Sequence, residues 1–119
     1  MNRNYRQLPK IVNNWLYLNK AWIVGSGVDW YLGKDKNRPK DLDILIPYNQ
    51  WNKACKLIPY NQNIIVNSFG GFKSIFDGID VDFWPSSLED YFEIGVFTMG
   101  KKEIKALRLN TYTLVIGNN

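Results

Sequence analysis

The chain has 119 residues, of which 45% are hydrophobic and 15% aromatic, and its formal net charge is +4 at pH 7. This length predicts one domain, and the composition is that of a globular chain and not a disordered one. The sequence has no histidine and one cysteine, which excludes a histidine-based triad or dyad and an internal disulfide, and disfavours a structural zinc site. The positive charge favours anionic partners such as nucleotides or nucleic acid.

The sequence contains no apolar run of the roughly 18 residues that would indicate a transmembrane helix. Its start, residues 1–10, is polar and lacks the apolar stretch of a secretory signal peptide. The lone Cys55 is consistent with a reducing compartment. We therefore expect no membrane association and a cytoplasmic location.

Hydrophobic periodicity and turn residues predict helices and strands in alternation. In chain order, the expected elements are a helix over 9–19, a strand over 21–24, a glycine turn over 25–27, a short helix over 28–32, a polar loop over 34–40, a strand over 41–46 and a helix over 47–58. These are followed by an edge strand over 63–66, strands over 72–76 and 79–84, a helix over 86–92, and a closing hairpin of 103–109 with 112–116. This order predicts an α+β fold, with a small mixed or antiparallel sheet flanked by helices on one side.

The dipeptide Asp77-Gly78 lies between two strand-like runs. Such a dipeptide is a strong hairpin signal, because a type I′ turn needs two residues with positive φ. At 86–92, Ser86 or Ser87 is the expected N-cap of the helix.

Four aspartates lie in strand-like apolar surroundings: Asp41, Asp43, Asp80 and Asp82. Aspartate is a poor strand former, and aligned carboxylates repel each other and lose hydration. Residues two apart in a strand point to the same face, so each pair is expected to be aligned. A hard cation such as Mg²⁺, which prefers oxygen ligands, would compensate the charge. The alternatives are that these aspartates begin exposed edge strands, or that they pair with Lys40, Lys73 or Arg38.

The turn Gly25-Ser26-Gly27 follows the first predicted strand. Its backbone N–H groups and the Ser26 hydroxyl could hold phosphate oxygens. Alternatively, its glycines only permit positive φ or close packing of the strand against the helix. The turn has neither the P-loop pattern nor the dinucleotide-binding glycine pattern.

Taken in order, these segments resemble the nucleotidyltransferase superfamily with the DNA polymerase beta-like catalytic core. That family shows a hydrophobic run ending in Gly-Gly/Ser, then Asp-x-Asp opening a strand, then an aspartate between hydrophobic residues on a later strand. The matching stretches are Ile23-Val24-Gly25-Ser26, Asp41-Leu42-Asp43-Ile44 and Val81-Asp82-Phe83.

Locally, the chain is similar to the head domain of tRNA CCA-adding enzymes and poly(A) polymerases. The stretches that carry this likeness are Gly25-Ser26-Gly27-Val28-Asp29, Leu32-Gly33 and Pro39-Lys40-Asp41-Leu42-Asp43. The arginine that the family has between its valine and aspartate is missing here. The family's Arg-Arg-Asp, which precedes a Phe-Thr pair, is also absent before Phe97-Thr98. In size, the chain resembles stand-alone minimal nucleotidyltransferases, some of which act with a helical partner protein.

The resemblance implies transfer of NMP from an NTP, ATP included, to a hydroxyl acceptor on RNA, protein or a small molecule. It implies Mg²⁺ or Mn²⁺ held by the catalytic residues Asp41, Asp43 and Asp82, with Asp80 as the competitor for the third position. Nucleotide binding is expected from Gly25, Ser26 and Lys40. Trp84 and Trp30 are candidates for base stacking, with core packing as the favoured use of both. Expected partners are NTP, RNA of a tRNA-like kind, or a small helical protein. The alternative is a catalytically inactive binding module of the same fold, which binds nucleotide, RNA or protein.

Overall fold

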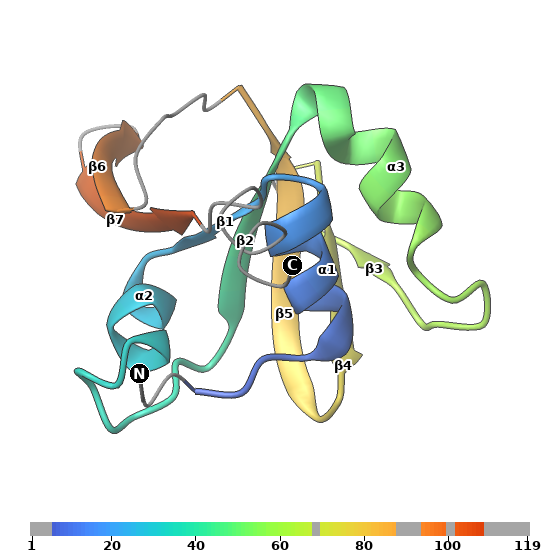
Figure 1. Cartoon of the computed structure of the whole chain (residues 1–119). Coiled ribbons are helices and arrows are strands. Elements are labelled where there is room, and N and C mark those ends of the chain that lie inside the picture. Colours follow the sequence, from blue (N-terminus) through green and yellow to red (C-terminus); the bar gives the residue numbers. More distant parts are fainter. Residues whose placement is uncertain (1–5, 68–69, 88–93, 100–101, 109–119) are drawn as a thin grey trace, which may run out of the picture.

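The computed structural model describes residues 6–67, 70–87, 94–99 and 102–108. The elements in this part of the chain alternate between helices and strands (Figure 1). They are α1 (Lys10–Leu18), β1 (Trp22–Val24), α2 (Ser26–Tyr31), β2 (Leu42–Pro47), a 3₁₀ turn (Tyr48–Gln50), α3 (Trp51–Lys56), β3 (Ile65–Val66), β4 (Phe72–Phe76), β5 (Ile79–Ser86), β6 (Ile94–Met99) and β7 (Lys102–Arg108). The fold is α+β, as the sequence predicts.

The described strands form a single mixed sheet in the order β3-β4-β5-β2-β1-β7-β6. Strands β2 and β5 are parallel, whereas the remaining neighbours in the sheet are antiparallel. The β2–β5 pair therefore brings together two segments separated by a helix and a hairpin in the sequence.

One face of the sheet carries the main hydrophobic core, to which α1, α2 and α3 all contribute. Helix α1 buries a stripe of side chains at helical spacing: Ile11, Val12, Trp15 and Leu16. The Trp15 ring lies 4.6 Å from the Phe83 ring and 5.7 Å from the Phe76 ring, centroid to centroid. Its Nε1–H donates to the Ala54 carbonyl at 3.1 Å, which joins α1 to α3 beneath the sheet.

The opposite face carries a smaller apolar cluster. Its buried members among the described residues all lie in strands β1, β2 and β7. Its fully buried centre is Trp22, Val24, Leu45 and Ala106, with Trp84 and Ile104 packed against it. Because strand side chains alternate between faces, Asp43 and Asp82 share this second face with Leu45 and Trp84. Polar and apolar rows thus lie side by side on it.

The Asp77-Gly78 hairpin is confirmed, with φ of 50° at Asp77 and 78° at Gly78. The expected helix over 86–92 is wrong at its start, because β5 continues to Ser86; residues 88–92 lie outside the described part. The expected closing hairpin is also corrected. Strand β7 pairs with the preceding β6, which the sequence did not predict, and 112–116 lies outside the described residues.

Two helices differ in their limits from the sequence prediction. Helix α2 already begins at Ser26, where a turn through Gly27 was expected. The helix expected over 47–58 is split into a 3₁₀ turn and α3, and Tyr48 is exposed. Its buried contact with the core is Ala54.

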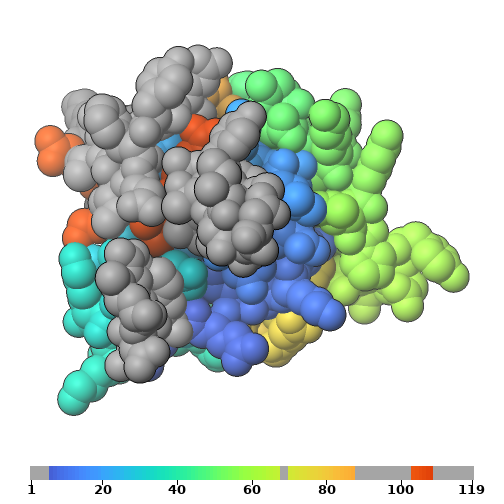
Figure 2. Space-filling model, viewed as in Figure 1, coloured from blue at the N-terminus to red at the C-terminus, as the bar shows by residue number. Residues whose placement is uncertain are grey.

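The turn between β3 and β4 is closed by Asn67, whose Oδ1 accepts from the Gly71 N–H at 2.8 Å. At Gly71 a Cβ atom would lie 2.1 Å from the Phe83 carbonyl oxygen and 2.3 Å from Trp84 Cβ, so only glycine permits this close crossing of β5. Figure 2 shows the chain between α3 and β3 projecting from the body of the molecule, and Tyr60 lies there fully exposed. No helix among the described residues has the length and apolar character needed to span a membrane.

Candidate acidic site

The centre of the candidate site is a pair of carboxylates on neighbouring parallel strands. Asp43 of β2 and Asp82 of β5 are partners in the β2–β5 register. Each is flanked in sequence by fully buried residues of the core: Leu42 and Ile44 around Asp43, and Val81 and Phe83 around Asp82. Core packing therefore fixes which face both carboxylates occupy.

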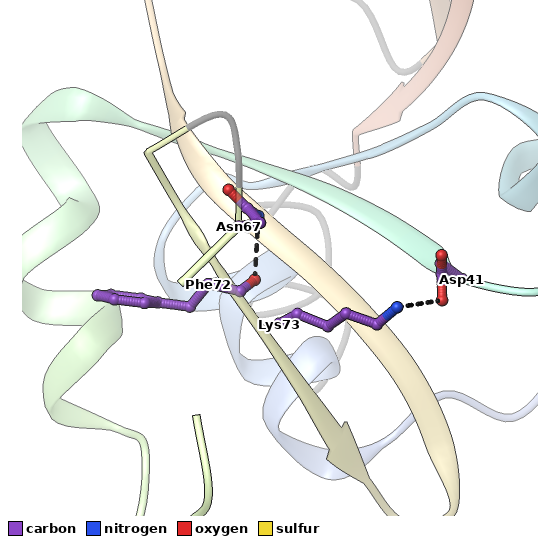
Figure 3. Close-up of polar contacts among 4 residues, drawn as sticks. All are labelled: Asp41, Asn67, Phe72 and Lys73. Atoms are coloured by element: carbon purple, nitrogen blue, oxygen red, sulfur yellow. Dashed lines mark hydrogen bonds and ion pairs between the residues drawn. The ribbon is translucent and has the colours of Figure 1, made fainter. Parts of the chain in front are cut away.

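The third predicted carboxylate, Asp41, immediately precedes β2 and is paired with a lysine. Lys73 Nζ lies 3.2 Å from Asp41 Oδ1 (Figure 3). Lys73 comes from β4, where its register partner is Asp82. Because β5 lies between β4 and β2 in the sheet, the Lys73 side chain crosses β5 to reach Asp41. The ion pair thus links β4 to the residue before β2 across β5, on the face of the sheet that carries Asp43 and Asp82, here called the acidic face.

The electrostatics of the site follow from this crowding. The pKa of Asp43 is raised to about 6, first by burial, then by the charges of Asp82 and Asp41, while Lys73 opposes the shift. The pKa of Lys73 is raised, mainly by its hydrogen bond and charge interaction with Asp41 and further by Asp82 and Asp80. The site thus holds more negative charge than its one neighbouring ammonium compensates.

The donor set of the candidate site consists of two facing carboxylates. Asp82 Oδ1 is shielded from solvent and has no hydrogen-bond partner among the described residues. Together with Asp43, it offers carboxylate oxygens of the kind that Mg²⁺ and Mn²⁺ prefer. In the part of the chain that is described, no group of three or more His, Cys, Asp or Glu side chains is arranged to hold a metal ion. Asp43 and Asp82 are therefore a facing pair, and Asp41 is engaged by Lys73.

The glycine turn adjoins this pair. Gly25 has a φ of 72° and a ψ of −145°, a conformation that favours glycine. A Cβ atom at Gly25 would lie 3.9 Å from Asp43 Oδ2, so the turn passes directly beside that carboxylate. The Gly25 N–H donates to the Lys105 carbonyl at 2.8 Å. The Gly25 N–H is therefore engaged by β7, while the Ser26 side chain is exposed.

The remaining predicted residues are placed as follows. Lys40 is exposed, directly before Asp41. Asp80 lies two residues before Asp82 on β5 and pairs in register with Ile75, so Asp82 and not Asp80 stands opposite Asp43. Trp30 is buried in the main core, which removes it as a stacking platform. Trp84 is partly buried on the acidic face, two residues after Asp82 on β5.

From the sequence, Lys73 is only one of three possible ion-pair partners for the aspartates, with Lys40 and Arg38. Its place in the site depends on the register of β4 against β5, in which Lys73 stands beside Asp82. A local signal does exist. Lys73 alternates with the inward-facing Phe72 and Ser74 of a strand, so it had to point to the face that carries Asp82.

Comparisons of the chain with protein-family models, with curated proteins and with solved structures found no match.

Proposed function

We propose that this chain is a metal-dependent nucleotidyltransferase, which moves NMP from an NTP to a hydroxyl acceptor and releases pyrophosphate. The observation that carries the proposal is the facing pair Asp43 and Asp82, on adjacent parallel strands and beside the Gly25 turn. Uncompensated carboxylates in an apolar sheet are costly, and a site for a divalent cation explains why the sequence keeps them.

Each residue has a role in this proposal. Asp43 and Asp82 hold Mg²⁺ or Mn²⁺, and Asp41 is a further ligand once it is released from Lys73. A bound divalent cation neutralises triphosphate charge and lowers the pKa of a coordinated hydroxyl. The Ser26 hydroxyl donates to a phosphate oxygen, and the exposed Lys40 supplies positive charge beside Asp41. Because Gly25 has no side chain, the approach to the Asp43 carboxylate stays open.

The base would lie over the next row of the same face. Leu45 and Trp84 are register partners, each two residues further along its strand than Asp43 and Asp82. An aromatic side chain at that place offers a stacking surface for any of the four bases. The acceptor hydroxyl can belong to RNA, to protein or to a small molecule.

The proposal is tested by thermal unfolding of the wild type and of Asp43→Asn with each NTP, with and without Mn²⁺. A ligand that binds only the folded state stabilises it by about 2.7 kcal/mol at a hundred times its Kd, so the melting temperature should rise. The rise should require Mn²⁺ and disappear in Asp43→Asn. The matched control is Asp35→Asn in the exposed loop before β2, which should respond as the wild type does.

Nucleotide stabilisation without a metal requirement, or its persistence in Asp43→Asn, would contradict the proposed site. Where the expected pattern appears, incubation with labelled NTPs and total RNA, protein or small molecules identifies the acceptor. Label should pass to the acceptor with the wild type and not with Asp43→Asn.

A second candidate function is a catalytically inactive binding module with the same fold. The ion pair between Lys73 and Asp41 favours it, because an ammonium there already neutralises one of the three expected metal ligands. This module would bind nucleotide, RNA or a protein partner and transfer nothing. It predicts NTP or RNA binding that Mn²⁺ does not strengthen, with no labelled acceptor.

A further inference from the structure

Lys73 occupies the position of a counter-cation in the acidic site. Its ammonium lies 3.2 Å from Asp41 Oδ1, and its own register partner on β5 is Asp82. Figure 3 shows the Lys73 side chain extended toward Asp41, with its charged end against the carboxylate. The Asp41 Oδ1 atom that contacts Lys73 is one of the two oxygens that Asp41 could offer to a divalent cation.

The pair is built so that it can open. The side chains of Lys73 and Asp41 are 37% and 28% exposed, although the Asp41 Oδ1 atom itself is shielded from solvent while Lys73 lies against it. Lysine carries a compact charge on a flexible stem, and exposed ion pairs of this kind contribute little to stability. Release of Lys73 therefore needs only a change of side-chain rotamer, with the backbone of β4 left in the sheet.

We propose that Lys73 is an exchangeable internal counter-ion, which holds Asp41 in the metal-free protein and which a divalent cation displaces. The proposal rests on the proposed function, because it takes the acidic site to be the metal site. A divalent cation close to Asp41 is repelled by the Lys73 ammonium, since both are positive. Lys73 thereby lowers the cation affinity of the site, and cation binding displaces it from Asp41.

The test is calorimetric titration with Mn²⁺ alone, on the whole chain. Lys73→Gln should bind Mn²⁺ about two- to fivefold more tightly than the wild type, the range expected from losing one exposed ion pair as a competitor. Lys73→Arg keeps a cation on Asp41 and should bind no more tightly than the wild type. Lys53 is exposed on α3 and is not part of the site. Lys53→Gln removes the same charge and should leave the Kd for Mn²⁺ unchanged.

A double-mutant cycle separates exchange at Asp41 from a general effect of charge. In an Asp41→Asn background, Lys73→Gln should tighten Mn²⁺ binding less than it does in the wild type. Equal tightening in both backgrounds would overturn the proposal, as would no tightening in the wild-type background or no Mn²⁺ binding by either protein. If Lys73→Gln does not fold, Lys73→Met keeps the apolar stem and takes its place.

The Mn²⁺ titrations are carried out without nucleotide, so failure of the exchange proposal can be distinguished from failure of the proposed function. If Mn²⁺ shows the exchange pattern and no NTP binds, the proposed transferase function fails while the exchange stands. If NTP and Mn²⁺ bind as expected and Lys73→Gln leaves the Mn²⁺ Kd unchanged, the exchange fails while the function stands.

Discussion

Asp43 and Asp82 stand opposite each other on the parallel strands β2 and β5, so that two carboxylates face the same side of one sheet. Register partners on one face of a sheet lie close together, and like charges there destabilise the fold. The consequence is a raised pKa at Asp43. Burial and the two neighbouring carboxylates raise the pKa of Asp43 from 3.8 to about 6.

This pKa shift predicts a stability that falls with rising pH. Between pH 3.8 and about 6, folded Asp43 holds its proton while unfolded Asp43 releases it. The folded protein then binds more protons, so its stability falls as pH rises through this window. The full shift corresponds to about 3 kcal/mol, and we expect about 2 kcal/mol because Asp43 is partly exposed.

The measurement is urea unfolding of the wild type and Asp43→Asn across this range. Asp43→Asn should be more stable than the wild type by about 2 kcal/mol above pH ~7 and equal to it below pH ~4. Comparing the two proteins cancels the other titrating groups. A difference that stays constant with pH would show that the Asp43 charge is not its cause.

Asp80 and Asp82 should differ as metal ligands, although both lie on the same face of β5. Only Asp82 is the register partner of Asp43. Asp82→Asn should weaken Mn²⁺ binding by at least about tenfold, since even the groups that merely support metal ligands cost that much when removed. Asp80→Asn, measured by the same calorimetric titration, should change the affinity less. The reverse order would assign the ligand role to Asp80.

Gly71 should tolerate no side chain, because its Cβ atom would meet the backbone carbonyl of Phe83. Gly71→Ala should destabilise the protein by about 3 kcal/mol or more, a size reserved for severe packing conflicts. Gly70→Ala is the matched control: φ is +79° there, but nothing lies within 4 Å of its Cβ position. It should cost only the about 1–2 kcal/mol of a left-handed conformation. Urea unfolding of both variants distinguishes the two effects.

Asp77, in the β4–β5 turn, should stabilise the N-terminus of α1 by a direct hydrogen bond. The helix has no side-chain cap at Pro9, and the N–H of Lys10 instead donates to Asp77 Oδ2 at 2.9 Å. Asp77→Ala should lose about 1 kcal/mol, the usual value of an N-terminal cap, and it also strains the turn. Asp77→Asn keeps an acceptor and tolerates positive φ, so it should lose much less. A loss in Asp77→Asn as large as that in Asp77→Ala, measured by thermal unfolding, would contradict this expectation.

Local signals in the sequence predicted much of the fold. The alternation in 72–76 and 79–84 and the Asp-Gly turn between them identified the β4–β5 hairpin, because all of its determinants lie within a few residues. The stripe of Ile11, Val12, Trp15 and Leu16 identified α1 for the same reason. Strand β6 was missed, and β7 was given the wrong partner, because pairing between strands depends on contacts that no single segment specifies.

Strand periodicity alone places Asp43 and Asp82 on the side opposite a buried row, because side chains alternate and Leu42, Ile44, Val81 and Phe83 face the core. That these two aspartates face each other, and that Lys73 reaches across β5 to Asp41, follows from the strand pairing. No local pattern specifies this pairing, because β2 and β5 are distant in sequence. Their parallel pairing and register are fixed by how their apolar faces pack together beneath α1 and α3.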